Sequence, residues 1–259
     1  MPFISASAIT PYNSIRGGAA GEALDPILAY SPYNVWDSEH VTIDGDVTTV
    51  LDYNNVGAKL NMVNPSAATQ PELITNDSSF NNKPFLRFSG TDYLENSIIN
   101  YRSSDSTGIV AGVMRVNSGS GIYPLTSSSS TVSNAYWGRT IKTSNKFSVL
   151  AYNTISERSY VQDNEIIPNG VFSFCYGVDG SDTFIILNAI NNGVTYIQEI
   201  PSGNTSAWLD SVDARDDLKI GALGTDGSNV DIANVGYYPY TSIADAISLS
   251  NVLKTKYGI

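Results

Sequence analysis

Apolar runs separated by turn residues recur along most of the chain, from about residue 27 to residue 239. Runs such as GIVAGVM (108–114) and VFSFCYG (171–177) are apolar at consecutive positions. Consecutive apolar positions are typical of strands with both faces buried, as in a sheet that lies between two layers. About ten or more short strands at this spacing predict an all-β fold, a two-sheet antiparallel sandwich of the jelly-roll type.

Turn signals separate these strands. NNG (191–193) lies between two strand-like segments, residues 182–190 and 194–200. Because Asn and Gly adopt the positive φ angles that tight turns need, this stretch predicts a β-hairpin. SSSST (127–131) has low complexity and is interpreted as a solvated loop.

The chain closes with a helical rather than an alternating pattern. Ser242 is a suitable N-cap, Asp245 follows it as a short version of the capping box, and Gly258 suits the left-handed position after a helix. Lys254 and Lys256 fall in the last turn, where positive charge offsets the helix dipole. One amphipathic helix of about 15 residues is therefore predicted to pack on the sandwich. Its predicted apolar stripe consists of Ile243, Ile247, Val252, Leu253 and Tyr257.

The N-terminal residues 1–26 differ from the rest of the chain. Two short apolar groups precede RGGAAGEA (16–23), which offers little surface to bury. We interpret this part as a docking arm with a hinge, and residues 27–259 as one jelly-roll domain. The alternative, that residues 1–24 are a first strand and loop of the main domain, stays open. The arm residues expected to make assembly contacts are Phe3, Ile4, Ile9, Pro11, Tyr12, Ile15 and Arg16.

Composition narrows the function classes. The net charge is −11 over 259 residues, and Lys and Arg form no cluster, which argues against nucleic acid and anionic membranes as partners. Cys175 is the only cysteine, so no intrachain disulfide is possible, and its apolar setting predicts a buried thiol. We expect no signal peptide and no transmembrane segment, because the N-terminal apolar run is short and lacks a basic region.

Two stretches of the chain resemble a known family. LKIGALGTDGSNVDIANVGYYPYTSIADAISLSNVLKTKYGI (218–259) resembles the closing segment of bacterial and phage laminin-G-like (concanavalin A-like) jelly-roll domains. KPFLRFSGTDYL (83–94) resembles a second recurrent strand of that family. The resemblance implies the fold over residues 27–259 and implies no activity, because this fold carries many functions. Asn234 replaces the acidic residue usual in the family, and residues 95–217 carry no family motif.

A shorter resemblance concerns the N-terminus. ISASAITPYNSIRGG (4–18) looks like the start of structural proteins of tailed bacteriophages. This likeness implies an arm that docks on a virion and a jelly roll displayed outward.

Catalytic chemistry has few candidates. His40 is the only histidine, so a Ser/His/Asp or Cys/His pair would have to use it, and no G-x-S-x-G motif is present. QDNEII (162–167) places Asp163 and Glu165 on one strand face, as two carboxylates of a glycosidase would require. Paired acids on one strand are also common on solvated edges, so we expect a protein that is not an enzyme.

Calcium is the one cofactor that the sequence makes a candidate; otherwise we expect none. Related sandwiches hold this ion with aspartates and carbonyls of loops. DGSD (179–182) offers Asp179 and Asp182, and TDGSN (225–229) offers Asp226 beside Thr225. The alternative is that both stretches are ordinary turns, in which Asp-Gly is common.

Glycan contact is the other binding chemistry that the composition favours. Sugars stack on exposed aromatic rings while polar side chains bind their hydroxyls. The alternative is that these aromatic residues belong to the core. The candidate contacts are Tyr136, Trp137 and Arg139 in NAYWGR (134–139), and Trp208 and Asp210 in GNTSAWLD (203–210).

Three functional hypotheses follow from these observations. The first is a non-enzymatic virion structural protein of a tailed phage: a decoration, fibre or tail-associated subunit, made in the host cytoplasm. Its expected partners are other virion proteins, further copies of this chain as a homo-oligomer, and a host-surface glycan. The second is a secreted or surface carbohydrate-binding module or adhesin. The third is a polysaccharide-degrading enzyme that uses Asp163 and Glu165.

Overall fold

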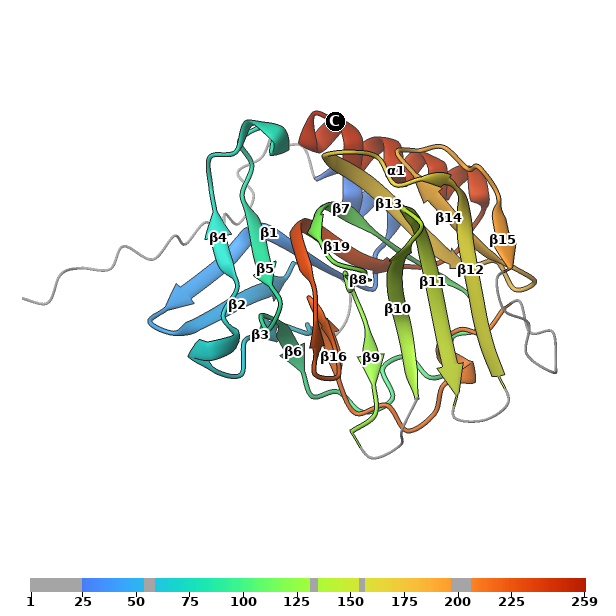
Figure 1. The fold of residues 1–259 in the computed structure, drawn as a ribbon, viewed down its shortest axis with the longest axis horizontal. Helices are drawn as coiled ribbons and strands as arrows, with labels where there is room; N and C mark the ends of the chain where they lie inside the picture. Colours follow the sequence, from blue (N-terminus) through green and yellow to red (C-terminus); the bar gives the residue numbers. More distant parts are fainter. Residues whose placement is uncertain (1–24, 54–58, 131–134, 154–156, 197–205) are drawn as a thin grey trace, which may run out of the picture.

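The computed structural model describes residues 25–53, 59–130, 135–153, 157–196 and 206–259. These residues form two antiparallel sheets packed face to face and one helix near the C-terminus (Figure 1). The fold is a β-sandwich of the jelly-roll type, which confirms the fold class predicted from the sequence.

The larger sheet has eleven strands. Nine form a continuous path with the order β14 (Thr183–Leu187), β13 (Val171–Val178), β7 (Gly108–Ser118), β19 (Asn229–Tyr238), β1 (Asn34–Asp44), β2 (Val47–Asp52), β3 (Met62–Val63), β6 (Leu94–Asn96) and β16 (Leu218–Ile220). Off this path, β5 (Phe85–Ser89) pairs with β19, and β4 (Glu72–Ile74) pairs with β5.

The smaller sheet has six strands. Their order is β15 (Val194–Tyr196), β12 (Glu157–Ile166), β11 (Lys146–Asn153), β10 (Tyr136–Thr143) and β8 (Gly121–Ile122), with β9 (Ser127–Ser128) also paired to β10. A separate small hairpin joins β17 (Ala222–Leu223) to β18 (Asp226–Gly227). The short 3-10 helices are η1 (Pro26–Tyr30), η2 (Ala67–Thr69), η3 (Ser78–Phe80) and η4 (Leu209–Ser211).

The central strand β7 explains the consecutive apolar pattern. Val110 and Met114 join the core between the two sheets, whereas Ile109, Ala111 and Val113 join a second core beneath the helix. Both faces of the strand are therefore buried, as the sequence pattern predicts.

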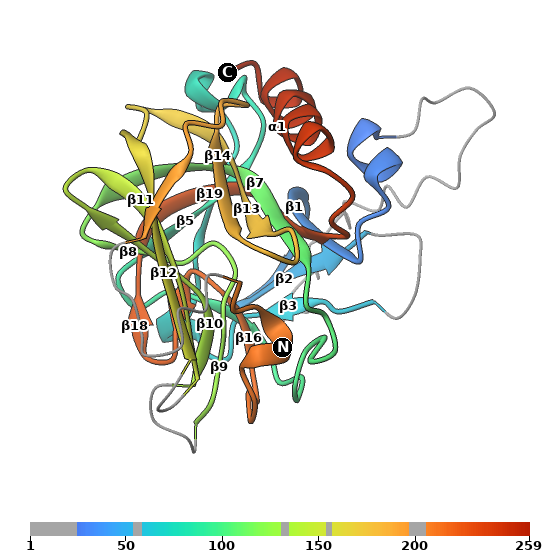
Figure 2. The ribbon, with the colours of Figure 1, turned by 90° about the vertical axis from the view of Figure 1, so that its right-hand side faces the viewer.

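The helix α1 (Ile243–Tyr257) covers the outer face of the larger sheet, on the side away from β10, β11 and β12 (Figure 2). The predicted ends are confirmed: the Asp245 amide donates to Ser242 Oγ at 3.0 Å, and Gly258 has φ 66°. The buried stripe differs from the predicted one, because the helix is rotated so that Ile243, Ile247 and Val252 lie at its margins. The side chains it buries are Ala246, Leu249, Ser250, Leu253 and Tyr257. No helix in the described residues is long and apolar enough to cross a membrane.

The hairpin predicted around NNG is wrong. The strand before it, β14, pairs with β13 in the larger sheet, and the strand after it, β15, pairs with β12 in the smaller sheet. The chain turns earlier, where the Ile190 amide donates to the carbonyl of Leu187 at 3.0 Å. Residues 191–193 thus carry the chain from one sheet to the other.

Candidate functional site

The two tryptophans predicted to contact a glycan lie in the core between the sheets. Trp137 is 0% exposed and Trp208 is 1% exposed. Their rings meet edge to face at 5.1 Å, and Trp208 Nε1 donates to the Tyr237 hydroxyl at 3.1 Å. Because no ring face is accessible, the structure contradicts a stacking role for either side chain and supports the alternative that both belong to the core.

Tyr136 lies next to Trp137 but on the opposite side of β10, where it is partly exposed. The register of β10 against β11 shifts between Tyr136 and Arg139, at a bulge that contains Gly138 with φ 74°. A Cβ atom at Gly138 would lie 2.4 Å from the Leu125 carbonyl oxygen, so glycine is needed there. The bulge brings the backbone position of residue 139 to the same face of the sheet as Tyr136. The side chain of Arg139 lies outside the described part.

Asp210 is exposed on η4, and its carboxylate accepts from the Ser211 hydroxyl at 3.2 Å. Since Trp208 points into the core, these two residues do not form the predicted binding pair. The predicted arm contacts, Phe3, Ile4, Ile9, Pro11, Tyr12, Ile15 and Arg16, lie outside the described residues.

A polar groove of about 590 Å³ opens where β9 and β16 meet at the edge of the sandwich. Hydroxyl groups supply much of its lining, together with one aromatic ring and one ion pair. The lining residues are Thr69, Thr91, Tyr93, Ser128, Ser129, Ser130, Asp217, Lys219, Gly224 and Thr225. Ser128 also pairs with Tyr136 across β9 and β10, so the groove borders the face that carries Tyr136.

The charged groups of the groove are held by local hydrogen bonds. The Asp217 carboxylate accepts from the amide of Ser128 at 2.5 Å and from its hydroxyl at 2.8 Å. Lys219 Nζ lies 3.1 Å from Asp217 Oδ2 and 5.0 Å from the centre of the Tyr93 ring. These contacts fix an ammonium, a carboxylate and a ring around one opening. The sequence interpretation of SSSST as a solvated loop missed this groove, because its charged partners lie some 90 positions later in the chain.

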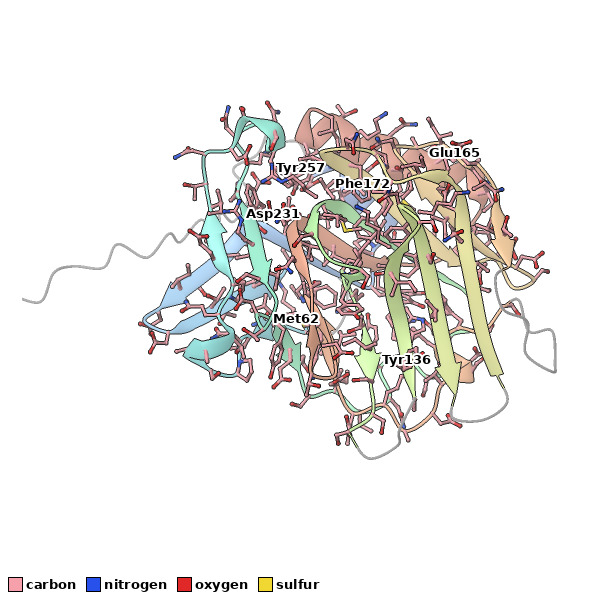
Figure 3. All side chains as sticks on the ribbon, in the orientation of Figure 1. Met62, Tyr136, Glu165, Phe172, Asp231 and Tyr257 are labelled. Carbon is pink, nitrogen blue, oxygen red and sulfur yellow. The ribbon has the colours of Figure 1, made fainter. Side chains whose placement is uncertain are left out.

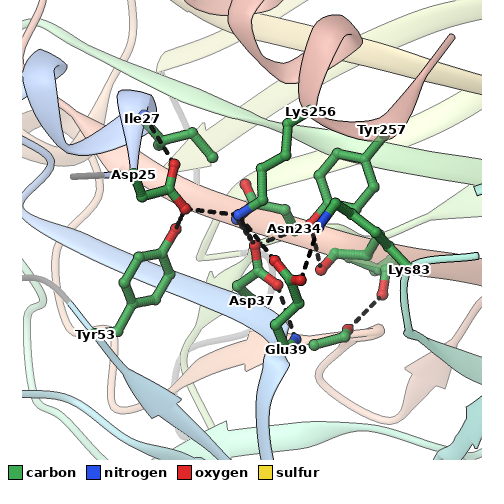
Figure 4. A network of polar contacts seen from close by, with 12 residues as sticks. Asp25, Ile27, Asp37, Glu39, Tyr53, Lys83, Asn234, Lys256 and Tyr257 are labelled. Atoms are coloured by element: carbon green, nitrogen blue, oxygen red, sulfur yellow. Dashed lines mark hydrogen bonds and ion pairs between the residues drawn. The ribbon is translucent and has the colours of Figure 1, made fainter. Parts of the chain in front are cut away.

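A second polar cluster, here called the Lys256 clasp, lies beneath the end of α1 (Figure 4). Lys256 Nζ lies 2.7 Å from Asp25 Oδ2, 2.8 Å from Asp37 Oδ2 and 3.2 Å from Glu39 Oε2. The Tyr257 hydroxyl donates to Asp37 Oδ2 at 2.9 Å. The clasp joins η1, β1 and α1, and the adjoining surface groove measures about 850 Å³.

Charge pairing governs the pKa values in the clasp. Burial alone would raise the pKa of Asp37, but the positive charge of Lys256 and hydrogen bonds from Lys256, Glu39 and Tyr257 hold it below its usual value. Burial would lower the pKa of Lys256, but Asp37 and Asp25 raise it above its usual value. Both groups therefore stay charged near neutral pH, and each charge faces an opposite one. This arrangement indicates a structural role for the clasp.

The catalytic candidates do not converge. Asp163 is 0% exposed, and its Oδ1 accepts from the Glu165 amide at 2.7 Å, whereas the Glu165 side chain is exposed. Burial raises the pKa of Asp163. Figure 3 shows Glu165 and Tyr136 at opposite ends of the smaller sheet. His40 packs against the ring of Tyr53 at 4.4 Å between ring centres.

The predicted metal positions are exposed turns. Asp179 Oδ1 accepts from the amides of Ser181 at 2.8 Å and of Asp182 at 2.9 Å, and Asp226 is exposed on the β17–β18 hairpin. Within the ranges that the structure describes, no group of three or more His, Cys, Asp or Glu side chains could hold a metal ion. Cys175 is buried as predicted, and burial raises the pKa of its thiol.

No family model and no curated protein match the chain. Solved structures similar to it include a Trypanosoma rangeli sialidase in complex with sialic acid, with a TM-score of 0.55 and 11% identity over 86% of this chain and 32% of the sialidase chain. A binding domain of botulinum neurotoxin DC in complex with rat synaptotagmin II has a TM-score of 0.53 and 12% identity over 86% of this chain and 52% of the other.

A Ruminococcus gnavus IT-sialidase CBM40 bound to α2,3 sialyllactose has a TM-score of 0.50 and 10% identity. The match covers 64% of this chain and 96% of the CBM40 chain. The chain spans about a third of the length of the sialidase chains that it matches. At these identities the likeness shows the fold alone, a β-sandwich of the kind found in these binding domains.

Proposed function

We propose that the chain is a non-catalytic glycan-binding protein and that the polar groove beside Ser128 is its binding site. The observation that carries this proposal is the groove lining, which combines serine and threonine hydroxyls with the Tyr93 ring and the Asp217–Lys219 pair. A sugar presents hydroxyls that both donate and accept hydrogen bonds, together with an apolar ring face, so it needs this mixture of groups. The buried Asp163 and the exposed Glu165 support a binding role over a catalytic one.

The structural neighbours agree with this proposal. Two of them were solved with a sugar ligand, sialic acid in one and α2,3 sialyllactose in the other. The shared sandwich supports the proposal at the level of the fold, and the function itself depends on the site. The groove supplies the site on which the hypothesis can be tested.

The wider setting that we propose is the particle of a tailed phage, in which this chain is a decoration, fibre or tail-associated subunit. The support is the N-terminal sequence ISASAITPYNSIRGG (4–18), which resembles the start of such structural proteins. In that setting the groove serves adhesion to the host surface. A secreted or surface adhesin uses the same groove without a particle. Immunogold labelling of particles from the source culture separates the two settings, because only a virion protein places gold at a fixed position on them.

Glycan-array screening of the full chain, followed by titration of the best-bound oligosaccharide, tests the groove. We expect Tyr93→Ala and Asp217→Asn each to weaken binding at least about tenfold, which corresponds to about 1.4 kcal/mol. Tyr33→Ala is the matched control, since Tyr33 is 36% exposed and lies outside the groove. Unchanged affinity in both groove variants, with thermal unfolding showing that they are folded, would contradict the groove as the site.

A further inference from the structure

Three hydroxyl groups that line the polar groove donate their protons to acceptors within the protein. The Ser128 hydroxyl donates to Asp217 Oδ2 at 2.8 Å, and the Ser130 hydroxyl donates to Asp216 Oδ2 at 2.6 Å. The Thr69 hydroxyl donates to the backbone carbonyl three residues earlier, at 2.9 Å. Because a hydroxyl has one proton and two lone pairs, these three groups offer a ligand their lone pairs, which accept hydrogen bonds.

The two aspartates that receive the serine protons add further acceptors. Asp217 Oδ1 accepts from the Ser128 amide at 2.5 Å, and both carboxylate oxygens of Asp216 lie 3.1 Å from the Ser130 amide nitrogen. A carboxylate has about four lone-pair sites. Asp217 uses these sites for the amide and hydroxyl of Ser128 and for the ammonium of Lys219, so one site is left for a ligand. The wall of the groove beside β9 is therefore rich in acceptors.

Lys219 is the one positive side chain among the described residues that line the groove, and its ammonium is engaged within the protein. Its Nζ donates to the Gly224 carbonyl at 2.9 Å, and it lies 3.1 Å from Asp217 Oδ2 and 3.8 Å from Glu95 Oε2. The side chain is 11% exposed. Two carboxylates thus face one ammonium, and a carboxylate of a ligand would have to displace one of them to reach it.

The charges around the groove are mostly negative. The carboxylates of Asp216, Asp217 and Glu95 surround the single ammonium of the lining. Arg215 lies behind β9, where its Nη1 is 3.4 Å from the Ser127 hydroxyl, and it is 0% exposed. Since its guanidinium is enclosed by the fold, a ligand in the groove cannot contact it. An anionic group in the groove would therefore meet carboxylates rather than a free cation.

We infer that the groove binds a glycan that is rich in hydroxyl donors and carries no acidic group, and that Asp216 and Asp217 determine this preference. The inference rests on the proposed function and specifies its ligand class. Each sugar hydroxyl brings a proton to the acceptors of the groove, and a hydrogen bond from a hydroxyl to a carboxylate is stronger than one between neutral groups. The carboxylate of an acidic sugar has no proton to donate at neutral pH, and it is repelled by the aspartates.

A glycan array of neutral and acidic members, followed by titration of the full chain, tests the inference. The titrated pairs are lactose with sialyllactose, carboxyl-reduced oligogalacturonate with oligogalacturonate, and the best-bound neutral glycan of the array with its product of oxidation to the uronic acid. We expect the neutral member to bind at least about tenfold more tightly in each pair that binds. Its affinity should change less than about twofold as sodium chloride is raised, because the ligand carries no charge to screen.

Two variants test the role of the aspartates. Asp217→Asn and Asp216→Asn each keep the shape of the side chain, remove its negative charge and add an amide donor. Each should reduce the ratio of neutral to acidic affinity, by about tenfold for Asp217→Asn, whose carboxylate lines the groove. Glu165→Gln is the matched control, since it removes the same charge from an exposed position outside the groove. It should change the ratio less than about twofold.

Equal or tighter binding of the acidic members, or a ratio that both aspartate variants leave unchanged in folded protein, overturns the inference and leaves the proposed glycan function standing. Failure to bind any glycan of the array contradicts both. Circular dichroism of each variant shows whether a change in binding comes from unfolding. The preference of the unmodified chain decides the inference even where a variant does not fold.

Discussion

Single residues in the Lys256 clasp connect the two ends of the described chain. Asp37 is 0% exposed on β1 and accepts hydrogen bonds from Lys256, Tyr257 and Asn234. A buried carboxylate is costly unless it is paired, and here the pairing comes from the last turn of α1. The sequence indicated only a dipole role for Lys256, the same as for Lys254. Lys254 does remain at the surface of the helix end, where it donates to the Asn188 carbonyl at 3.2 Å.

Replacing Lys256 by Met should destabilise the protein by about 3–5 kcal/mol, because it leaves Asp37 buried without its positive partner. Urea unfolding at neutral pH measures the effect. The double variant Asp37→Asn with Lys256→Met should recover a large part of the loss, since it removes the unpaired charge. Lys254→Met is the matched control and should cost less than about 1 kcal/mol. A similar loss in both single variants would contradict the clasp as a stabilising element.

The pH dependence of the clasp has a definite sign. The pKa of Asp37 is lowered in the folded state, so its contribution to stability is present above the unfolded pKa of about 3.9 and is lost as the pH falls through the folded value. The pKa of Lys256 is raised, so its contribution is present below about 10.4 and is lost only as the pH rises through the folded value. The clasp therefore contributes constantly between about pH 5 and about pH 9.

Lys256→Met should reverse the pH dependence that Asp37 gives to the stability of the fold. Without Lys256, burial raises the pKa of Asp37. The unpaired carboxylate therefore lowers the free energy of unfolding most at high pH, and this loss becomes smaller as the carboxyl takes up a proton. Urea unfolding at about pH 5 and about pH 8 measures the free energy of unfolding, and the difference between the variant and the wild type should be smaller at the lower pH. An equal difference at both values would mean that Asp37 is not the group left unpaired.

At the scale of elements, local patterns predict some features and fail for others. The ends of α1 follow from Ser242 and Gly258, because capping depends on residues within one turn. The pairing of β15 depends instead on β12, about thirty positions earlier in the chain, which no local pattern around NNG reveals. Tyr136 and Trp137 show the same limit. They are adjacent aromatics after one polar loop, and only the packing of β10 decides which one faces the core.

The cap of α1 offers a test at this scale. Ser242→Ala removes the hydroxyl that accepts from the Asp245 amide at 3.0 Å, and it should destabilise the protein by about 1 kcal/mol. Thr255→Ala removes an exposed hydroxyl of the same helix that donates back to the Asn251 carbonyl, and it should cost less than about 0.5 kcal/mol. Thermal unfolding of the two variants compares them directly. Equal effects would show that the helix end frays and that its cap does not contribute.

The whole molecule is a sandwich whose two cores share the larger sheet. One core lies between the sheets and contains Trp137 and Trp208, and the other lies beneath α1 and contains Cys175 and Tyr257. Composition and pattern predict this class of fold because buried strands have a distinct sequence signature. They do not predict the groove, because Ser128 and Asp217 come together only through the fold, 89 positions apart in the chain.

The proposed boundary between arm and domain can be tested on the whole chain. Asp25 is the first described residue: its carboxylate accepts from the Ile27 amide at 3.0 Å and pairs with Lys256 at 2.7 Å. A deletion of residues 1–24 keeps these contacts, so we expect a folded domain that no longer incorporates into particles. A deletion of residues 1–30 also removes Asp25 and the fully buried Ile27, and it should lose several kcal/mol of stability, about 2–5 for the core side chain alone.

Circular dichroism melts measure the stability of each deletion variant, and a separate particle-incorporation assay measures its docking. Normal incorporation of the shorter deletion would contradict the arm as the docking element. Unfolding of the shorter deletion would place the domain boundary upstream of Asp25, as the alternative of a first strand within residues 1–24 requires. A folded domain that binds its glycan but no longer joins particles would separate the two proposed roles, with docking in the arm and recognition in the sandwich.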